Sequence, residues 1–261
     1  MKNCISIFIV LLMSVSLFAQ TNMLIRKTDG SVHSFPITEI DSVYYEESST
    51  FNCGDELIDY DGNVYQTVEI GDQCWMAENL LVSHEPDGTE ILFVDDDATW
   101  MDLEDNDTDK AYCWYDDDST TNAGIYGALY THAAANNACP AGWHLPSDEE
   151  FKTLEIYAGM SQEEADAMFW RGTIAAKLKA TYGWFEDGNG TDDYGFSYLP
   201  NGSRLSYGGG FGDLGSWGNL WTATENSSPE VWFRYFGYSK DGIMRYFAGK
   251  SNGFAVRCVK D

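Results

Sequence analysis

The stretch Cys139–Phe151, with the sequence CPAGWHLPSDEEF, constrains the fold more than any other part of the chain. Pro146 has no backbone N–H to donate, so an element that precedes it ends there. Ser147 is followed three residues later by Glu150, which is the capping-box pattern that opens a helix. The sequence therefore predicts a helix from Ser147 to about Ala158.

The end of the chain is the second constraint. The segment Gly253–Val259 alternates apolar and polar residues and predicts a final strand. It contains Cys258, so one cysteine precedes the predicted helix and another lies in the last predicted strand. A disulfide between these two cysteines could close the fold.

Residues 1–19 have the features of a signal peptide. Lys2 gives a positive start, Ile5–Leu17 is an apolar run, and the segment ends on the small residue Ala19. The run is too short to span a bilayer, and an uncleaved membrane anchor is the alternative. We expect an exported protein, secreted or associated with the cell surface or outer membrane, with no transmembrane segment in the mature chain.

The formal net charge of −27 limits the partners of the chain. Nucleic-acid binding requires a basic face, and an anionic membrane surface would also repel this protein. An acidic surface keeps an exported protein soluble and attracts cations. Six cysteines less Cys4 of the signal peptide leave an odd number, so disulfide formation after export would leave one thiol over.

Three segments follow from the patterns along the chain. After residues 1–19, residues 20–50 hold two strand-like runs around Asp29-Gly30, which predict a β-hairpin followed by a linker. Residues 51–261 then form one domain.

In this domain, helices are expected at Tyr126–Asn136, from Ser147, and from Ser161 to about Ala180. Short strands follow, with a hairpin of Val231–Tyr238 and Ile243–Phe247. Tyr207–Gly218 holds six glycines and predicts irregular structure. Two to three helices followed by short antiparallel strands indicate an α+β fold.

Several motifs, in this order, resemble one family, the Fibrobacter succinogenes major paralogous domain. The resemblance covers roughly Cys53 to Asp261 and rests on the motifs Asp61–Gly71 (DGNVYQTVEIG), Trp75–Leu80 (WMAENL), Tyr126–Tyr130 (YGALY), Cys139–Ser147 (CPAGWHLPS), Asp192–Phe196 (DDYGF), Trp221–Glu225 (WTATE) and Gly253–Cys258 (GFAVRC). It implies a fold similar to the C-type lectin domain and to the formylglycine-generating enzyme. The family has no established biochemical activity.

The resemblance also implies a disulfide pairing. In C-type lectins a cysteine beside a helix pairs with one in the last strand, and Cys139 and Cys258 match those places. We expect that bond, with Cys74–Cys113 as a second pair and Cys53 left over. The related formylglycine-generating enzyme uses a reactive cysteine pair late in its chain. Because Cys258 is the only cysteine here after Cys139, that chemistry is not expected.

Other chemistry has little support in the sequence. No His-Glu-x-x-His zinc pair and no Gly-x-Ser-x-Gly elbow is present. Calcium is the one cofactor suggested, because Asp105, Asp107 and Asp109 alternate and Asp116 follows seven residues later. Lys110 stands where an EF-hand loop requires glycine, and a solvated acidic loop is the alternative.

Aromatic residues around the glycine-rich segment form the candidate ligand surface. Tyr207 opens that segment and Trp217 closes it, while Trp232 and Arg234 share one face of a predicted strand. Core packing is the alternative for both tryptophans. We predict a non-catalytic binding or adhesion module of the bacterial cell envelope whose target is a glycan or an envelope protein. The alternatives are an oxidase like the formylglycine-generating enzyme and a purely structural surface protein.

Overall fold

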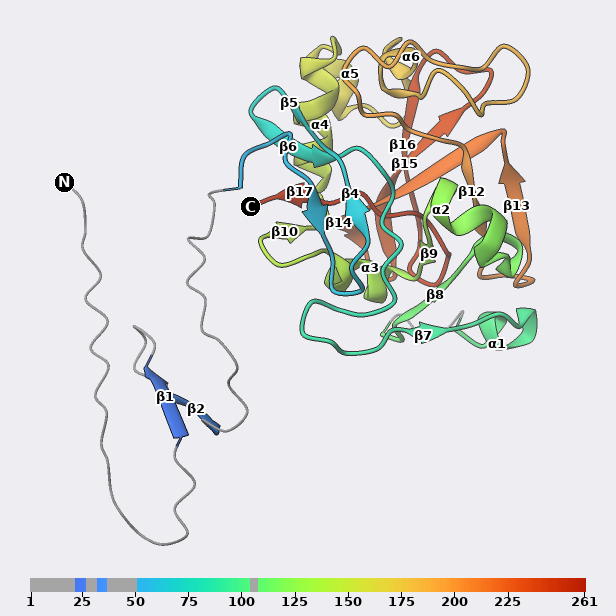
Figure 1. Cartoon of the computed structure of the whole chain (residues 1–261). Helices are drawn as coiled ribbons and strands as arrows, with labels where there is room; N and C mark the ends of the chain where they lie inside the picture. The colour runs from blue at the N-terminus through green and yellow to red at the C-terminus, as the bar shows by residue number, and fades with distance from the viewer. Residues whose placement is uncertain (1–21, 27–31, 37–50, 104–107) are drawn as a thin grey trace, which may run out of the picture. The chain divides into compact units, whose positions relative to one another are not determined.

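The computed structural model describes residues 22–26, 32–36, 51–103 and 108–261, and the predicted signal peptide lies outside these residues. The chain divides into two units, residues 1–50 and 51–261. In the first unit β1 (Asn22–Arg26) pairs antiparallel with β2 (Val32–Pro36) (Figure 1). The second unit contains both helices and sheets, so the α+β prediction is confirmed.

A six-stranded sheet is the largest element of residues 51–261, with the strand order β11-β16-β15-β14-β12-β13. Its strands, in this order, are Phe169–Arg171, Ile243–Gly249, Glu230–Gly237, Trp217–Ser227, Asn201–Arg204 and Phe211–Leu214. β15 and β16 form the antiparallel hairpin that the sequence predicts. The glycine-rich segment is more regular than predicted, because β13 pairs with β12 across it.

The described residues of this unit also form three smaller sheets. The first has the order β10-β17-β6-β5, the second is β7-β8-β9, and the third pairs β3 with β4. Their strands are β10 (Trp143–His144), β17 (Val259–Lys260), β6 (Gln73–Met76), β5 (Thr67–Ile70), β7 (Leu92–Phe93), β8 (Ala111–Cys113), β9 (Leu129–Tyr130), β3 (Leu57–Ile58) and β4 (Val64–Tyr65). The predicted final strand is therefore shorter than expected. Phe254 and Ala255 make only single bridges, to Tyr130 and Leu220.

The longest helix, α4 (Asp148–Tyr157), begins and ends where the sequence predicts. Ser147 is its N-cap, and the capping box with Glu150 is complete. Ser161 and Glu164 form a second capping box at α5 (Gln162–Asp166). The remaining helices are α1 (Asp97–Met101), η2 (Tyr115–Asp117), η3 (Ser119–Ala123), α2 (Gly124–Tyr126), α3 (His132–Ala138) and α6 (Ala175–Leu178).

Two of the predicted helices are wrong in part. Leu129 and Tyr130 form β9 inside the segment expected to be the first helix. The third predicted helix ends early, since α5 is followed by β11 and then by α6. In both cases strand pairing within a sheet overrides local helix propensity. None of the described helices is long and apolar enough to cross a membrane.

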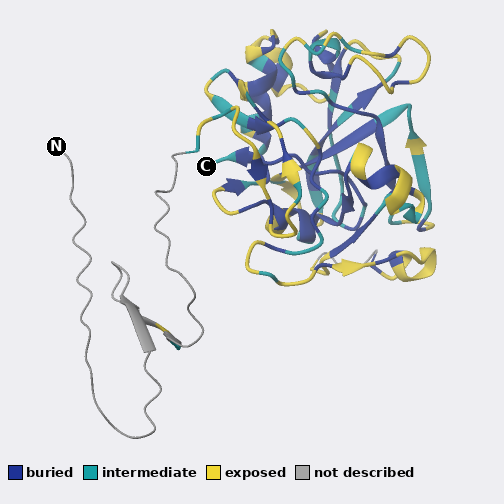
Figure 2. Cartoon of the chain, viewed as in Figure 1, coloured by how far each residue is buried: buried dark blue, intermediate teal, exposed yellow. Residues whose placement is uncertain are grey.

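The core lies on both faces of the large sheet because side chains alternate along each strand. Val231 and Phe233 of β15 belong to one hydrophobic cluster, with Trp221 and Phe254. Phe236 belongs to another, with Phe151 of α4. In the large sheet β12 and most of β15 are buried, whereas β13 is intermediate to exposed, and α1 is exposed apart from Trp100 (Figure 2).

Two disulfides tie the unit together. Cys139 bonds to Cys258, as predicted, and joins the residue after α3 to the residue before β17. The predicted Cys74–Cys113 pair is wrong, because Cys74 bonds to Cys53. Cys113 lies in β8, and its thiol is buried and free.

Cys113 should be chemically inert in the native protein. Burial raises the pKa of its thiol to about 12, and the thiolate is the reactive form of cysteine. We expect no alkylation of Cys113 by iodoacetamide at pH 8 in the folded protein, and full alkylation after unfolding. Peptide mapping by mass spectrometry without reductant measures both states. Labelling of Cys113 in the native protein would contradict its buried position.

Candidate ligand-binding surface

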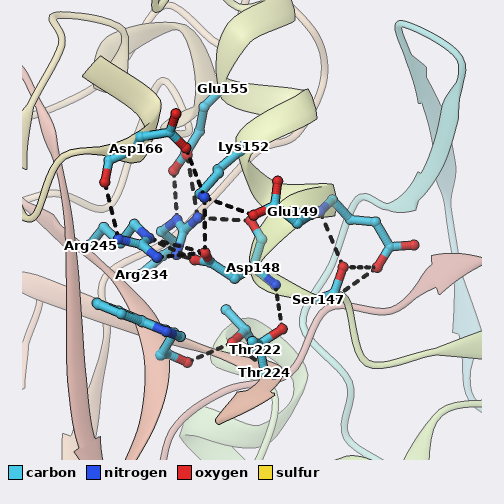
Figure 3. Close-up of polar contacts among 12 residues, drawn as sticks. Ser147, Asp148, Glu149, Lys152, Glu155, Asp166, Thr222, Thr224, Arg234 and Arg245 are labelled. Carbon is cyan, nitrogen blue, oxygen red and sulfur yellow. Dashed lines mark hydrogen bonds and ion pairs between the residues drawn. The ribbon is translucent and has the colours of Figure 1, made fainter. Parts of the chain in front are cut away.

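The face of the large sheet beneath α4 carries a cluster of buried charges. Asp148 accepts hydrogen bonds from Arg234 Nη1 at 2.8 Å and from Arg245 Nη2 at 2.7 Å. Glu155, two turns further along α4, accepts from Arg234 Nε at 2.7 Å and from Arg171 Nη1 at 2.8 Å. Figure 3 shows Asp148 and Glu155 pointing from the helix toward Arg234 and Arg245. We call Asp148, Glu155, Arg171, Arg234 and Arg245 the charge cluster.

Three further charged side chains, Lys152, Asp166 and Glu149, lie beside the charge cluster. Lys152 Nζ lies 2.9 Å from Asp166 of α5 and 2.7 Å from Glu149 (Figure 3).

Burial alone would raise the pKa of Asp148, but its hydrogen bonds and charge interactions with Arg245 and Arg234 outweigh burial and lower that pKa. Asp148 is therefore an anion at every pH at which proteins normally fold.

Arg234, predicted as a ligand contact, lies buried within the charge cluster. Its side chain is 0% exposed, and it already binds two carboxylates and stacks over Phe151. The physical reason is that an arginine at an inward strand position requires buried counter-charges, which α4 supplies. Trp232 lies on the same sheet face, where the Arg245 guanidinium covers its ring at 3.7 Å and Phe247 meets its edge.

Three aromatic rings gather on the opposite face of the sheet, and we call them the aromatic cluster. Trp217 of β14 stacks on Tyr235 of β15, with ring centroids 4.9 Å apart. Trp170 of β11 lies 5.8 Å from Tyr235 and 5.9 Å from Trp217. Gly237 is opposite Trp217 in the register, and a Cβ there would overlap the indole ring. The missing side chain therefore makes room for Trp217.

The aromatic cluster is partly exposed and has polar groups around it. Lys240 Nζ lies 5.5 Å above the Trp170 ring. Burial and the negative charge of Asp213 raise the pKa of the Tyr235 hydroxyl, so this hydroxyl stays a neutral donor. In the described part of the chain, neither the indole N–H groups of Trp170 and Trp217 nor the Tyr235 hydroxyl has a hydrogen-bond partner.

The predicted aromatic surface is therefore only partly assembled. Trp217 pairs with position 237 and Trp232 lies on the other face of β15, so these two tryptophans do not meet. Tyr207 is 75% exposed and makes no ring contact within the described residues. The structure adds Trp170 and Tyr235, which the sequence reasoning missed.

A signal for part of the cluster was present in the sequence. Period two along β15 places Tyr235 and Arg234 on opposite faces of the sheet, so an arginine on the face beneath α4 implies a tyrosine on the other face. Trp170 had no such signal, because it lies in a segment with a helical pattern.

Two of the four predicted calcium ligands lie among the described residues, and two lie outside them. Asp105 and Asp107 are outside them, Asp109 is exposed, and Asp116 lies in η2 with φ of 53°. Nearby, Arg204 is fully buried and its guanidinium lies 3.0 Å from Asp97 and 3.5 Å from Asp117. Among the residues with a described position, no group of three or more His, Cys, Asp or Glu side chains could hold a metal ion. Calcium binding stays a prediction.

Comparison with known proteins identifies the family. Residues 68–260 match the Fibrobacter succinogenes major domain, and this segment includes α4, the whole large sheet and the aromatic cluster. The same comparisons gave no match to a curated protein or to a solved structure. Because the match spans well over half of the sequence, the chain belongs to the Fibrobacter succinogenes major domain family.

Proposed function

We propose that this protein is an exported, non-catalytic binding module of the cell envelope that holds a glycan on the aromatic cluster. The observation that carries the proposal is the group of three partly exposed rings whose polar atoms have no partner in the described part of the chain. An aromatic ring offers an apolar face, and tyrosine and tryptophan add one donor each. A sugar ring has a matching apolar face and hydroxyl groups around its edge.

The groups at the edge of the cluster fit the same ligand. Lys240 supplies a donor beside Trp170, and Asp213 supplies an acceptor near Tyr235. Binding sites combine a mostly apolar surface with a few polar groups that fix orientation. An envelope protein is the second candidate target, because aromatic side chains also anchor protein interfaces.

We further propose a C-type-lectin-like fold and a non-catalytic role. The Cys139–Cys258 bond, which links the segment before α4 to the last strand, supports the fold proposal. The same bond supports the functional proposal, since it occupies the cysteine that an oxidase of the formylglycine-generating type would need. If the reduced protein converted a substrate cysteine to formylglycine, the non-catalytic proposal would fail.

Truncating the cluster should abolish most glycan affinity. We expect Trp217→Ala and Trp170→Ala each to weaken binding by about 2 kcal/mol, or roughly 30-fold in Kd. A glycan array on the purified protein, with and without a chelator, identifies the ligand, and calorimetry gives Kd. Tyr182→Ala is the control, because Tyr182 is 61% exposed and lies outside the cluster.

Thermal unfolding of the same variants separates binding from folding. A folded Trp217→Ala variant with unchanged glycan affinity would count against the proposal. Loss of array signals with the chelator would add calcium to the site.

A further inference from the structure

A second candidate site lies away from the aromatic cluster, in a pocket of about 200 Å³. It lies between the end of β3, the loop at Pro86 and the residues around Cys139. It is lined by the Tyr60 ring, the His84 imidazole and Asp59, and by the apolar residues Ile58, Pro86, Ala138, Pro140 and Ala141. An apolar cavity of about 150 Å³ is enough for one benzene ring. The size and the walls therefore fit a single ring.

His84 is held in one orientation. Its Nδ1 lies 2.6 Å from Asp61 Oδ1, and Asp61 is fixed in turn by the backbone N–H and the hydroxyl of Ser83. Burial raises the pKa of Asp61, but the hydrogen bonds from Ser83 and His84 outweigh it and lower that pKa. Asp61 is thus a carboxylate, so the Nδ1 atom of His84 carries the proton. In the neutral imidazole, Nε2 is then a hydrogen-bond acceptor.

The second nitrogen of His84 is the polar atom left for a ligand. Nε2 has no hydrogen-bond partner among the described residues. The carboxylate of Asp59, which also lines the pocket, accepts hydrogen bonds from Tyr65 Oη at 2.6 Å, from Asn63 Nδ2 and from two backbone N–H groups. The hydrogen-bonding capacity of the Asp59 carboxylate is therefore already used within the protein. Nε2 of His84 is therefore the side-chain acceptor that the pocket offers to the hydroxyl group of a ligand.

We propose that this pocket binds a phenolic ring, which packs against Tyr60 and donates its hydroxyl hydrogen to Nε2 of His84. The ring belongs either to a free phenol or to a tyrosine of a partner polypeptide. An apolar strip continues from the pocket, because Ile58 and its cross-strand neighbour Val64 are 60% and 52% exposed. The residues that flank a bound tyrosine in a partner polypeptide could pack against this strip.

The test is a pair of probes that differ by one hydroxyl. The ¹⁵N-labelled protein is titrated with p-cresol and with toluene, and the amide shifts of His84, Ala138 and Ala141 are followed. We expect saturable shifts and a Kd for p-cresol about tenfold below that for toluene, as one hydrogen bond allows. In His84→Phe this ratio should fall to about one. Tyr60→Ala should weaken both probes, and Tyr182→Ala should change neither.

Two results would overturn the proposal: equal binding of both probes by the unmodified protein, or no saturable shift with p-cresol. A blocked Ala-Tyr-Ala peptide distinguishes the sources. Tighter binding than p-cresol identifies a tyrosine of a polypeptide, and weaker binding identifies a free phenol. The outcome is independent of the glycan experiment, since it involves no residue of the aromatic cluster.

Discussion

Substituting Asp148 by asparagine should lower the free energy of unfolding by about 3–5 kcal/mol, the usual cost of removing one partner from a buried ion pair. Asp148 is only 4% exposed and binds both Arg234 and Arg245. The asparagine has the same shape, so the loss comes from charge rather than from packing. Chemical denaturation of the two proteins measures the difference.

The direction of this effect follows from the balance of charges. The charge cluster holds three guanidinium groups and only two carboxylates, those of Asp148 and Glu155. Removing Asp148 leaves three buried cations around one anion, while removing Arg234 would leave two of each. We therefore expect Asp148→Asn to cost more than Arg234→Met, although both break the same ion pair.

The control is Glu149→Gln, one residue along the same helix. Glu149 is 76% exposed and pairs with Lys152, so its loss should cost less than about 1 kcal/mol. The pH dependence gives a second check. The folded pKa of Asp148 lies below its ordinary value of 3.8, so its contribution is complete above that value. The difference between the two proteins should be constant from pH 8 to 5 and shrink as the pH falls below about 4.

The parts of the fold that the sequence predicts correctly depend on local signals. Ser147 and Glu150 form a capping box within four residues, and they locate α4 almost to the residue. The hairpin of β15 and β16 follows from two alternating runs around a turn containing Gly242. In each case the residues that determine the element lie next to one another in the chain.

The wrong predictions concern elements whose structure depends on pairing with residues far away in the sequence. Phe169–Arg171 forms a strand because β16 lies beside it, although the two are more than 70 residues apart in the chain. Cys74 pairs with Cys53 because β6 brings it there, while β8 keeps Cys113 buried in a separate cluster with Trp100 and Leu129. No local pattern contains this information.

The candidate sites show the same division. Alternation along β15 gives the two faces of the strand, and the sequence correctly places Trp232 and Arg234 together. The alternation does not show which of the two faces of β15 is covered by a helix. The spacing of Asp148 and Glu155, seven residues apart on one face of α4, predicts a basic partner on the strand that this helix covers. With Arg234 assigned to the face beneath α4, Tyr235 falls on the opposite face, where the aromatic cluster lies.

The Cys139–Cys258 disulfide should stabilise this domain more than the Cys53–Cys74 disulfide does. Its sequence separation of 119 residues corresponds to a stabilisation of about 5 kcal/mol in the chain-entropy treatment, against about 3 kcal/mol for the separation of 21 residues in Cys53–Cys74. We therefore expect the double variant Cys139→Ala/Cys258→Ala to unfold at much lower denaturant concentration than Cys53→Ala/Cys74→Ala.

The comparison of the two double variants is informative because each removes one bridge and leaves the other. Cys139 and Cys258 are both buried, so their replacement by alanine adds a packing loss to the entropic one. Equilibrium unfolding of both variants and the unmodified protein, all without reductant, gives the three free energies. Equal losses in the two variants would mean that loop length does not control the stability of this domain, and that the unfolded chain already holds its ends close together.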